Sequence, residues 1–219
     1  MLRDHTPSAN HERDRCRNRR RRLHILSLSL GAARIVEAAL SLAQDGYHAV
    51  QIRTVAQRSG VARATMYHYF PSKEHLLVAC LHRWLDDFET SAAVDLIGVA
   101  DPHDRLLRLL DRLNATLCAM PLFADAVARA YLYSIATVGG AVEDTRTRLS
   151  EMLAEAMGAG EVTSYHREVG GLLTDVWAAN VLAVVHRRAT VEQLRHRLQV
   201  TVDVIRHSRA TDVAPSSSE

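Results

Sequence analysis

Apolar residues recur at helical spacing along most of the chain, from residue 31 to residue 208. In the first such segment, ARIVEAALSLAQDGY, one face collects Ile35, Ala38, Ala39 and Leu42, which are separated by three or four residues. No segment shows sustained strict alternation of apolar and polar residues, so the sequence predicts an all-α fold without a sheet. Glycine and proline separate further helices, which we expect at about 73–97, 103–119, 121–137, 141–158, 165–188 and 191–208.

Basic residues are concentrated at the start of the chain. Residues 1–30 hold eight arginines and three acidic residues, a net charge of +5, whereas the rest of the chain carries a net charge of −3. A basic arm on a slightly acidic body favours contact with a polyanion, and its densest part is the run of arginines at 19–22. A disordered, solvated arm explains this composition equally well. Residues 209–219 also have a disordered composition.

The sequence lacks the usual patterns of metal, cofactor and catalytic sites. Cys16, Cys80 and Cys118 include no CxxC pair, the histidines include no HExxH, and there is no Gly-rich phosphate loop. The segment RRRRLHILSLSLGAA resembles a signal peptide but is too short to span a bilayer. We therefore expect a cytoplasmic protein that has no cofactor, catalytic residue or membrane contact. Two classes of protein are kept as alternatives to any DNA-binding interpretation of this chain: an all-helical enzyme, and an adaptor that does not bind DNA.

Residues 53–70 have the pattern of two short helices joined by a tight turn. Gly60 permits the turn and Val61 can anchor it in the core. In the second helix, Met66 and Phe70 share an inner face, with Ala62 one turn earlier. An apolar back and a polar front are what a recognition helix needs in order to enter a major groove.

The polar front carries side chains that suit DNA. An arginine can donate to a guanine edge or a phosphate, a histidine can reach a base edge, and an alanine can touch a thymine methyl group. Hydroxyl groups suit phosphate oxygens, as does a lysine at a helix N-terminus. The candidate DNA-binding residues are Arg53, Arg63, Ala64, Thr65, Tyr67, His68, Tyr69 and Lys73.

The segment 34–77, RIVEAALSLAQDGYHAVQIRTVAQRSGVARATMYHYFPSKEHLL, resembles the DNA-binding domain of the TetR family of bacterial repressors. The resemblance runs through the Gly-Val turn, TMYHYF and SKEHL, and it implies that the eight residues above contact DNA. It implies a three-helix helix-turn-helix domain at 31–76 and a larger helical ligand-binding and dimerisation domain at 77–208. Gln51 departs from the pattern, because many members have Ser or Thr there as a helix cap.

A narrower resemblance concerns the C-terminal part. The segments PLFADAVARAYLYS and DVWAANVLAVVHRRAT are similar to the actinobacterial TetR-family repressors of cholesterol catabolism, which implies a steroid or acyl-CoA ligand. Arg129 and Tyr131 are two positions apart and cannot both face the core. The candidate ligand-binding residues are Met120, Phe123, Arg129, Tyr133, Trp177 and Asn180, although for any one of them alone a role as core filling is slightly favoured. Asn180 is singled out because an amide among Val and Ala needs a partner.

Two apolar stripes in the last two helices predict a homodimer. One runs along 169–185 and the other consists of Leu194, Leu198, Val202 and Ile205. Two such helices from each of two subunits would form a four-helix interface, as the resemblance to the TetR family also implies. A purely intramolecular core is the alternative.

Overall fold

The computed structural model describes residues 30–137 and 139–212, with the side chains of 135–137, 139, 141 and 209–212 excepted. The basic arm before Leu30 and the end of the chain after Asp212 lie outside the described residues. Within the described part the chain is helical, and no strand is present there. The elements are α2 (Leu30–Ala43), η1 (Tyr47–Ala49), α3 (Ile52–Ser59), α4 (Arg63–Tyr69), α5 (Lys73–Ala92), η2 (Ala93–Leu96), α6 (Pro102–Cys118), α7 (Pro121–Thr137), α8 (Gly139–Gly158), α9 (Ser164–Val185) and α10 (Val191–Asp212).

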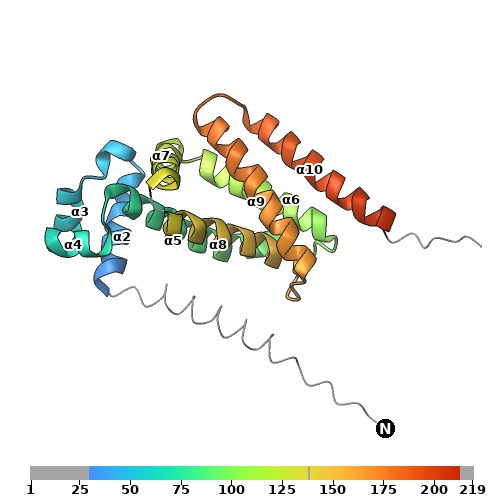
Figure 1. Ribbon diagram of the computed structural model, residues 1–219, viewed down its shortest axis with the longest axis horizontal. Helices are drawn as coiled ribbons and strands as arrows, with labels where there is room; N and C mark the ends of the chain where they lie inside the picture. Colours follow the sequence, from blue (N-terminus) through green and yellow to red (C-terminus); the bar gives the residue numbers. More distant parts are fainter. Residues whose placement is uncertain (1–29, 138, 213–219) are drawn as a thin grey trace, which may run out of the picture.

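The helices form a small group at one end and a larger group beside it (Figure 1). Helices α2, α3 and α4 make up the small group, and α5 leads from it into the larger one, where it packs against α7 and α8. The boundary expected between residues 76 and 77 therefore lies inside one continuous helix. Helix α9 packs along α8, and α10 covers α9 and α6 from outside.

Local sequence signals explain where the helices begin and end. The Ser72 hydroxyl accepts from the backbone N–H groups of Glu74 and His75, which caps α5. Helix α5 is shorter than predicted, because a 3-10 turn replaces the α-helix after Ala92. Helix α10 is longer than predicted and includes residues 209–212, which were expected to belong to a disordered tail.

The packing of the last two helices differs from the predicted dimer interface. Leu194, Leu198 and Val202 are buried inside the chain, where α10 packs on α9 and α6. A side chain buried in one chain cannot also contact a second chain, so for this stripe the intramolecular alternative holds. On α9, Leu173 and Trp177 are likewise buried, whereas Leu172 is half-exposed.

Helix α9 is also long and apolar enough to cross a membrane by length and composition. Core helices pass the same test, and α9 is packed between α8 and α10 with Leu173 and Val181 in the core. Of its most apolar stretch 33% is buried in this way, so the packing explains part of its apolar character.

Candidate DNA-binding and ligand sites

The turn between α3 and α4 is built around Gly60. Its φ of 64° lies in the left-handed region, and its N–H bonds to the carbonyl groups of Ala56 and Gln57. A larger residue is disfavoured by this conformation, whereas the Arg34 guanidinium, 2.5 Å from an added Cβ, is the end of a flexible side chain that can move aside. Val61 follows and packs against the core, as predicted. Gln51, before α3, makes no side-chain capping bond.

Helix α4 has a buried back and an exposed front. Met66 and Phe70 are buried, which confirms the predicted inner face, although Ala62 is exposed because it stands before the first helical residue. The front residues Arg63, Ala64, Thr65, Tyr67, His68 and Tyr69 are exposed. Burial of the apolar back fixes the orientation of α4, so its polar front faces solvent.

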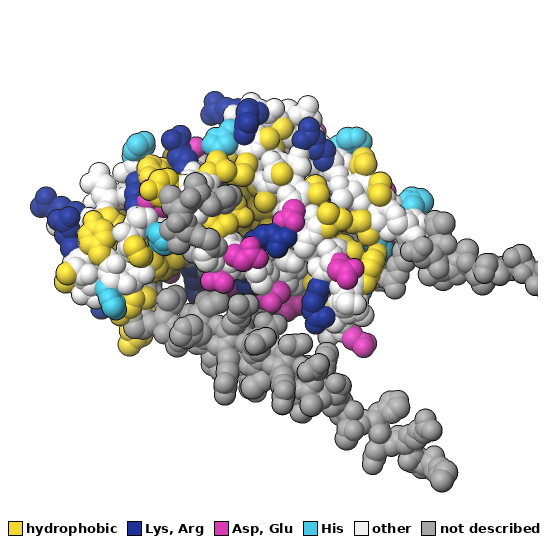
Figure 2. Space-filling view, in the orientation of Figure 1, with side chains coloured by type: hydrophobic (Ala, Val, Ile, Leu, Met, Phe, Trp, Pro, Cys, Tyr) yellow, Lys and Arg dark blue, Asp and Glu magenta, His cyan; other side chains and the backbone are white. Residues whose placement is uncertain are grey.

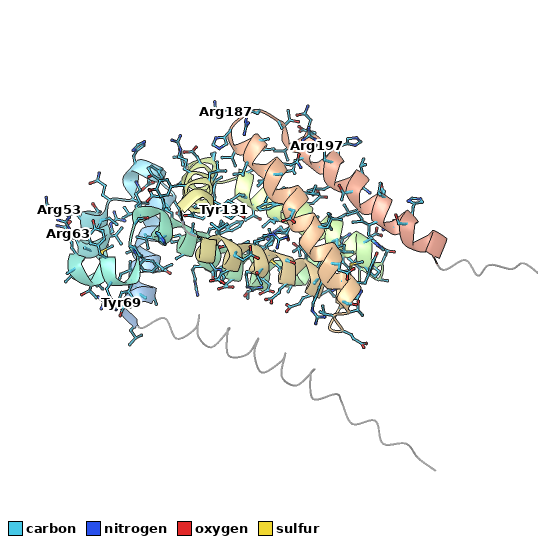
Figure 3. The ribbon with its side chains drawn as sticks, viewed as in Figure 1. Arg53, Arg63, Tyr69, Tyr131, Arg187 and Arg197 are labelled. Atoms are coloured by element: carbon cyan, nitrogen blue, oxygen red, sulfur yellow. The ribbon has the colours of Figure 1, made fainter. Side chains whose placement is uncertain are left out.

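Arginines from two helices gather at the same end of the molecule. Arg53 on α3 and Arg63 on α4 both lie at the outer end of the small group, and Tyr69 lies on the same group, apart from them (Figure 3). Figure 2 shows Lys and Arg side chains at this tip. The small group therefore exposes cations, hydroxyl groups and one imidazole to solvent.

Lys73 is held more tightly than a free surface lysine. Its Nζ lies 3.6 Å from the centre of the Tyr47 ring, and burial lowers the pKa of Lys73. The Tyr47 hydroxyl donates to Glu74 at 2.6 Å, and this bond raises the pKa of Tyr47 to about 12. Tyr47 therefore positions the first turn of α5, a role that sequence reasoning missed because the partners are 27 residues apart.

Helix α7 touches the small group directly. Leu122, near its beginning, lies against Gly46, where an added Cβ would be 3.7 Å from the Leu122 side chain. The same helix packs on η1, which carries Tyr47, and on α2. A shift of α7 would therefore change the packing of η1 and so the surroundings of Tyr47 and Lys73.

The larger group encloses an apolar cavity of about 60 Å³. Helices α5 to α9 all contribute to its wall, through residues that include Leu85, Leu117, Val127, Tyr131, Thr145 and Trp177. Pockets that hold drug-sized ligands usually measure roughly 300–1,000 Å³. A bulky ligand would therefore have to move these helices apart in order to enter.

One arginine lines this cavity. Arg146 on α8 makes two bonds of 2.7 Å to the carboxylate of Asp175 on α9. These bonds to Asp175 raise the pKa of Arg146, so the pair stays charged. Two residues further on, Arg148 pairs with Asp86 and Glu89 of α5, which ties α8 to the helix that leads to the small group.

Comparisons with known proteins agree with this architecture. The chain matches the family of bacterial regulatory proteins, tetR family, over residues 35–80, and a tetracyclin repressor-like C-terminal domain over residues 100–205. The HTH-type transcriptional repressor KstR of Mycolicibacterium smegmatis is 35% identical over 173 residues, which cover 78% of this chain and 85% of that repressor. The chain belongs to the TetR family. KstR of Mycobacterium tuberculosis is also 35% identical, over 78% of this chain and 79% of that repressor.

Solved structures of TetR regulators share the fold. A TetR transcriptional regulator from Rhodococcus sp. RHA1 superimposes with a TM-score of 0.70 at 23% identity, over 86% of this chain and 98% of that one. FadR of Thermus thermophilus, a TetR-family repressor solved in complex with lauroyl-CoA, gives 0.63 at 16% identity, over 86% of this chain and all of that one. The TetR-family chain described here is thus a transcriptional regulator and not an enzyme.

In this TetR-family chain the six candidate ligand-binding residues are not brought together. Trp177 lines the cavity, whereas Phe123 is buried beside Trp84, at 5.9 Å between ring centres, and Met120 packs against the core. Arg129 is exposed and pairs with Asp125, and Tyr133 is also exposed. Tyr131 lines the cavity, consistent with the argument that it and Arg129 face different ways.

Asn180 lies away from the cavity wall and its amide has partners. Its Nδ2 donates to the Val176 carbonyl at 2.7 Å, and its Oδ1 accepts from Arg197 of α10. The partner that an amide among Val and Ala needs is therefore supplied by the chain itself. The candidate set leaves out the polar residues of the cavity wall, and only their place in the folded wall identifies them: Tyr131, Thr145, Arg146 and Thr174.

Proposed function

We propose that the chain is a homodimeric, ligand-responsive repressor that places α4 in the major groove of a pseudo-palindromic operator and works in the cytoplasm. The observation that carries this proposal is the exposed polar front of α4 on a buried apolar back. In this reading Arg53, Arg63, Ala64, Thr65, Tyr67, His68, Tyr69 and Lys73 contact DNA. The relatives named KstR, which are called transcriptional repressors, support the direction of the effect.

The DNA-binding part of the proposal predicts two kinds of variant. Tyr67→Ala and Lys73→Ala should weaken binding to operator and random DNA alike, because phosphate contacts carry no sequence information. Arg63→Ala and His68→Ala should instead reduce the preference for the operator, each by about 1–3 kcal/mol. Gel shifts with the DNA that flanks the chain's own gene, beside random DNA, measure both.

Arg83→Ala is the matched control for these gel shifts. It removes one exposed positive charge from α5, where Arg83 pairs with Asp87, and should leave the preference unchanged. If Arg63→Ala lost affinity equally on operator and random DNA, its assignment to base recognition would be wrong. If the unmodified chain shifted neither DNA, an adaptor or an enzyme would become the better reading.

The exposed apolar residues on the outer faces of α9 and α10 support dimer formation. Leu172 on α9 and Val200 and Val204 on α10 are exposed, and the last two border a shallow surface hollow with Asp203 and His207. In a dimer whose two-fold axis runs near these helices, this patch of one chain would contact the same patch of the second chain. The two copies of α4 must then lie about 34–36 Å apart, or a multiple of this, to reach successive major grooves.

We propose that a bulky apolar ligand, a steroid or an acyl-CoA thioester, enters between α7 and α9 and releases the operator. The cavity is apolar and too small for such a ligand as it stands, so binding would displace α7, which also touches η1 beside Lys73. The ligand shifts DNA affinity only by as much as it prefers the displaced state. Lauroyl-CoA in the FadR complex supports the acyl-CoA class.

Trp177 allows a direct test of the ligand. In a Trp84→Phe background, a steroid acyl-CoA thioester should change the fluorescence of Trp177 and weaken operator binding about tenfold or more. Trp84 is replaced because its own fluorescence would add to that of Trp177. It lies on α5, where it stacks on Phe88. If neither Trp177 fluorescence nor operator affinity responds, the ligand class is wrong, while the DNA-binding assignment stands.

A further inference from the structure

Behind the cavity wall lies an asparagine, Asn114, which is bonded to the wall residue Trp177 and differs from Asn180 in its surroundings. Asn114 on α6 is 2% exposed, and its Oδ1 accepts a 2.8 Å bond from the indole Nε1 of Trp177. Its Nδ2 is buried and has no hydrogen-bond partner among the described residues. A buried amide donor left unpaired is costly, because it has lost the bonds it would make to water.

Trp177 determines which way the Asn114 amide points. An indole N–H is only a donor, so the atom that faces it must be the amide oxygen. The amide cannot turn over without placing its own NH₂ against the indole N–H. The NH₂ group is therefore held on the side away from the indole nitrogen, and whatever satisfies it must be an acceptor.

Asn114 lies directly beside the apolar cavity. Trp177, its partner, lines the cavity, and so does Leu117, one turn further along the same face of α6. Another polar residue of the wall is already used within its own helix, since the Thr174 hydroxyl donates to the Gly170 carbonyl at 2.8 Å. A ligand that displaces the wall between Trp177 and Leu117 would come close to the Asn114 side chain, which packs behind these two residues.

We propose that Asn114 determines ligand specificity in this cavity by donating from Nδ2 to a carbonyl oxygen of an otherwise apolar ligand. The inference rests on the proposed ligand site and deepens it, because it names the group that the ligand must carry. The ring of Trp177 then has two tasks: it forms part of the apolar wall, and it holds the amide with its donor available. A hydrocarbon of the same shape would leave the Nδ2 group unpaired and bind more weakly.

The test compares two small probes of nearly equal shape, cyclopentanone and methylenecyclopentane. They differ in a carbonyl oxygen against a methylene group, and they test the cavity without any assumption about the natural ligand. Dissociation constants come from Trp177 fluorescence in the full-length Trp84→Phe chain. After each dissociation constant is corrected by the probe's own water-to-hydrocarbon partition constant, which removes the stronger hydration of the ketone, we expect cyclopentanone to bind about tenfold more tightly, the effect of one buried hydrogen bond. Asn114→Leu should abolish this preference.

Asn180→Leu is the matched control, because it removes an amide of the same size whose partners lie outside the cavity wall. It should keep the full preference for the ketone. In the unsubstituted Trp84→Phe chain, the side-chain NH₂ resonances of Asn114 should also shift with cyclopentanone and not with methylenecyclopentane. This second measurement tests the bond from Asn114 to the ketone even if Asn114→Leu does not fold.

Three outcomes would overturn the inference: equal affinity for the two probes, a ketone preference that survives Asn114→Leu, or no binding of either probe. The first two would leave Asn114 as a structural partner of Trp177 alone. Release of the operator by steroid or acyl-CoA compounds is measured separately. A failure there would count against the proposed ligand class, whatever the probes show about Asn114.

Discussion

Replacing Gly170 by alanine is expected to lower the free energy of unfolding by about 2–3 kcal/mol. Gly170 lies on α9 where it packs along α8, and an added Cβ would be 2.5 Å from the backbone carbonyl oxygen of Ser150 and 3.1 Å from the amide nitrogen of Ala154. These are backbone atoms inside a helix, so they cannot turn aside as a flexible side chain would. The two helices must separate locally, and the cost exceeds the roughly 1 kcal/mol that alanine gains over glycine in a helix.

The neighbouring Gly171 provides the matched control. Its added Cβ would meet the Ser150 side chain at 3.7 Å, which is an ordinary contact. Gly171→Ala should therefore show the helix preference alone and raise the free energy of unfolding by up to about 1 kcal/mol. Urea unfolding followed by circular dichroism measures both variants. Changes of the same sign would mean that α8 and α9 pack less closely than the structure has them.

The helices and the helix-turn-helix could be predicted because their signals are local. The sequence predicted the turn at Gly60 and the buried pair Met66 and Phe70, and the structure confirms both. Each depends on residues within one or two turns of one another, so spacing alone identifies them. The DNA contacts themselves stay a prediction.

The partners of apolar stripes and buried amides could not be predicted in this way. The stripe through Leu194 and Leu198 correctly indicates burial, but periodicity does not say whether α9 of the same chain or a second chain covers it. The same reasoning, that an amide among apolar residues needs a partner, was applied to Asn180, whose partners are Val176 and Arg197. It applies better to Asn114, whose partner Trp177 is 63 residues away.

Replacing Arg148 by methionine is expected to lower the free energy of unfolding by about 2–4 kcal/mol, because it leaves two carboxylates without their partner. The Arg148 side chain is only 13% exposed and bonds to Asp86 at 2.9 Å and to Glu89. Although burial opposes it, these two bonds raise the pKa of Arg148, so the guanidinium stays charged. Methionine keeps most of the apolar stem, so the loss reports the charges rather than the packing.

Arg146→Met is the matched control for Arg148→Met, since the two residues are two positions apart on α8 and both make paired bonds to carboxylates. Arg146 and Asp175 are more exposed, at 35% and 55% of their side chains, so water screens the pair. Exposed pairs are worth about 1 kcal/mol or less, which sets the expected loss for Arg146→Met.

Urea unfolding in low and high salt separates the two variants, because salt should weaken the Arg146 pair far more than the Arg148 pair. Equal losses would show that α5 and α8 are not held by a shielded ion pair. A much larger loss at Arg148 would identify its bonds to Asp86 and Glu89 as a main attachment between the cavity-lining helices and the helix that begins at Lys73.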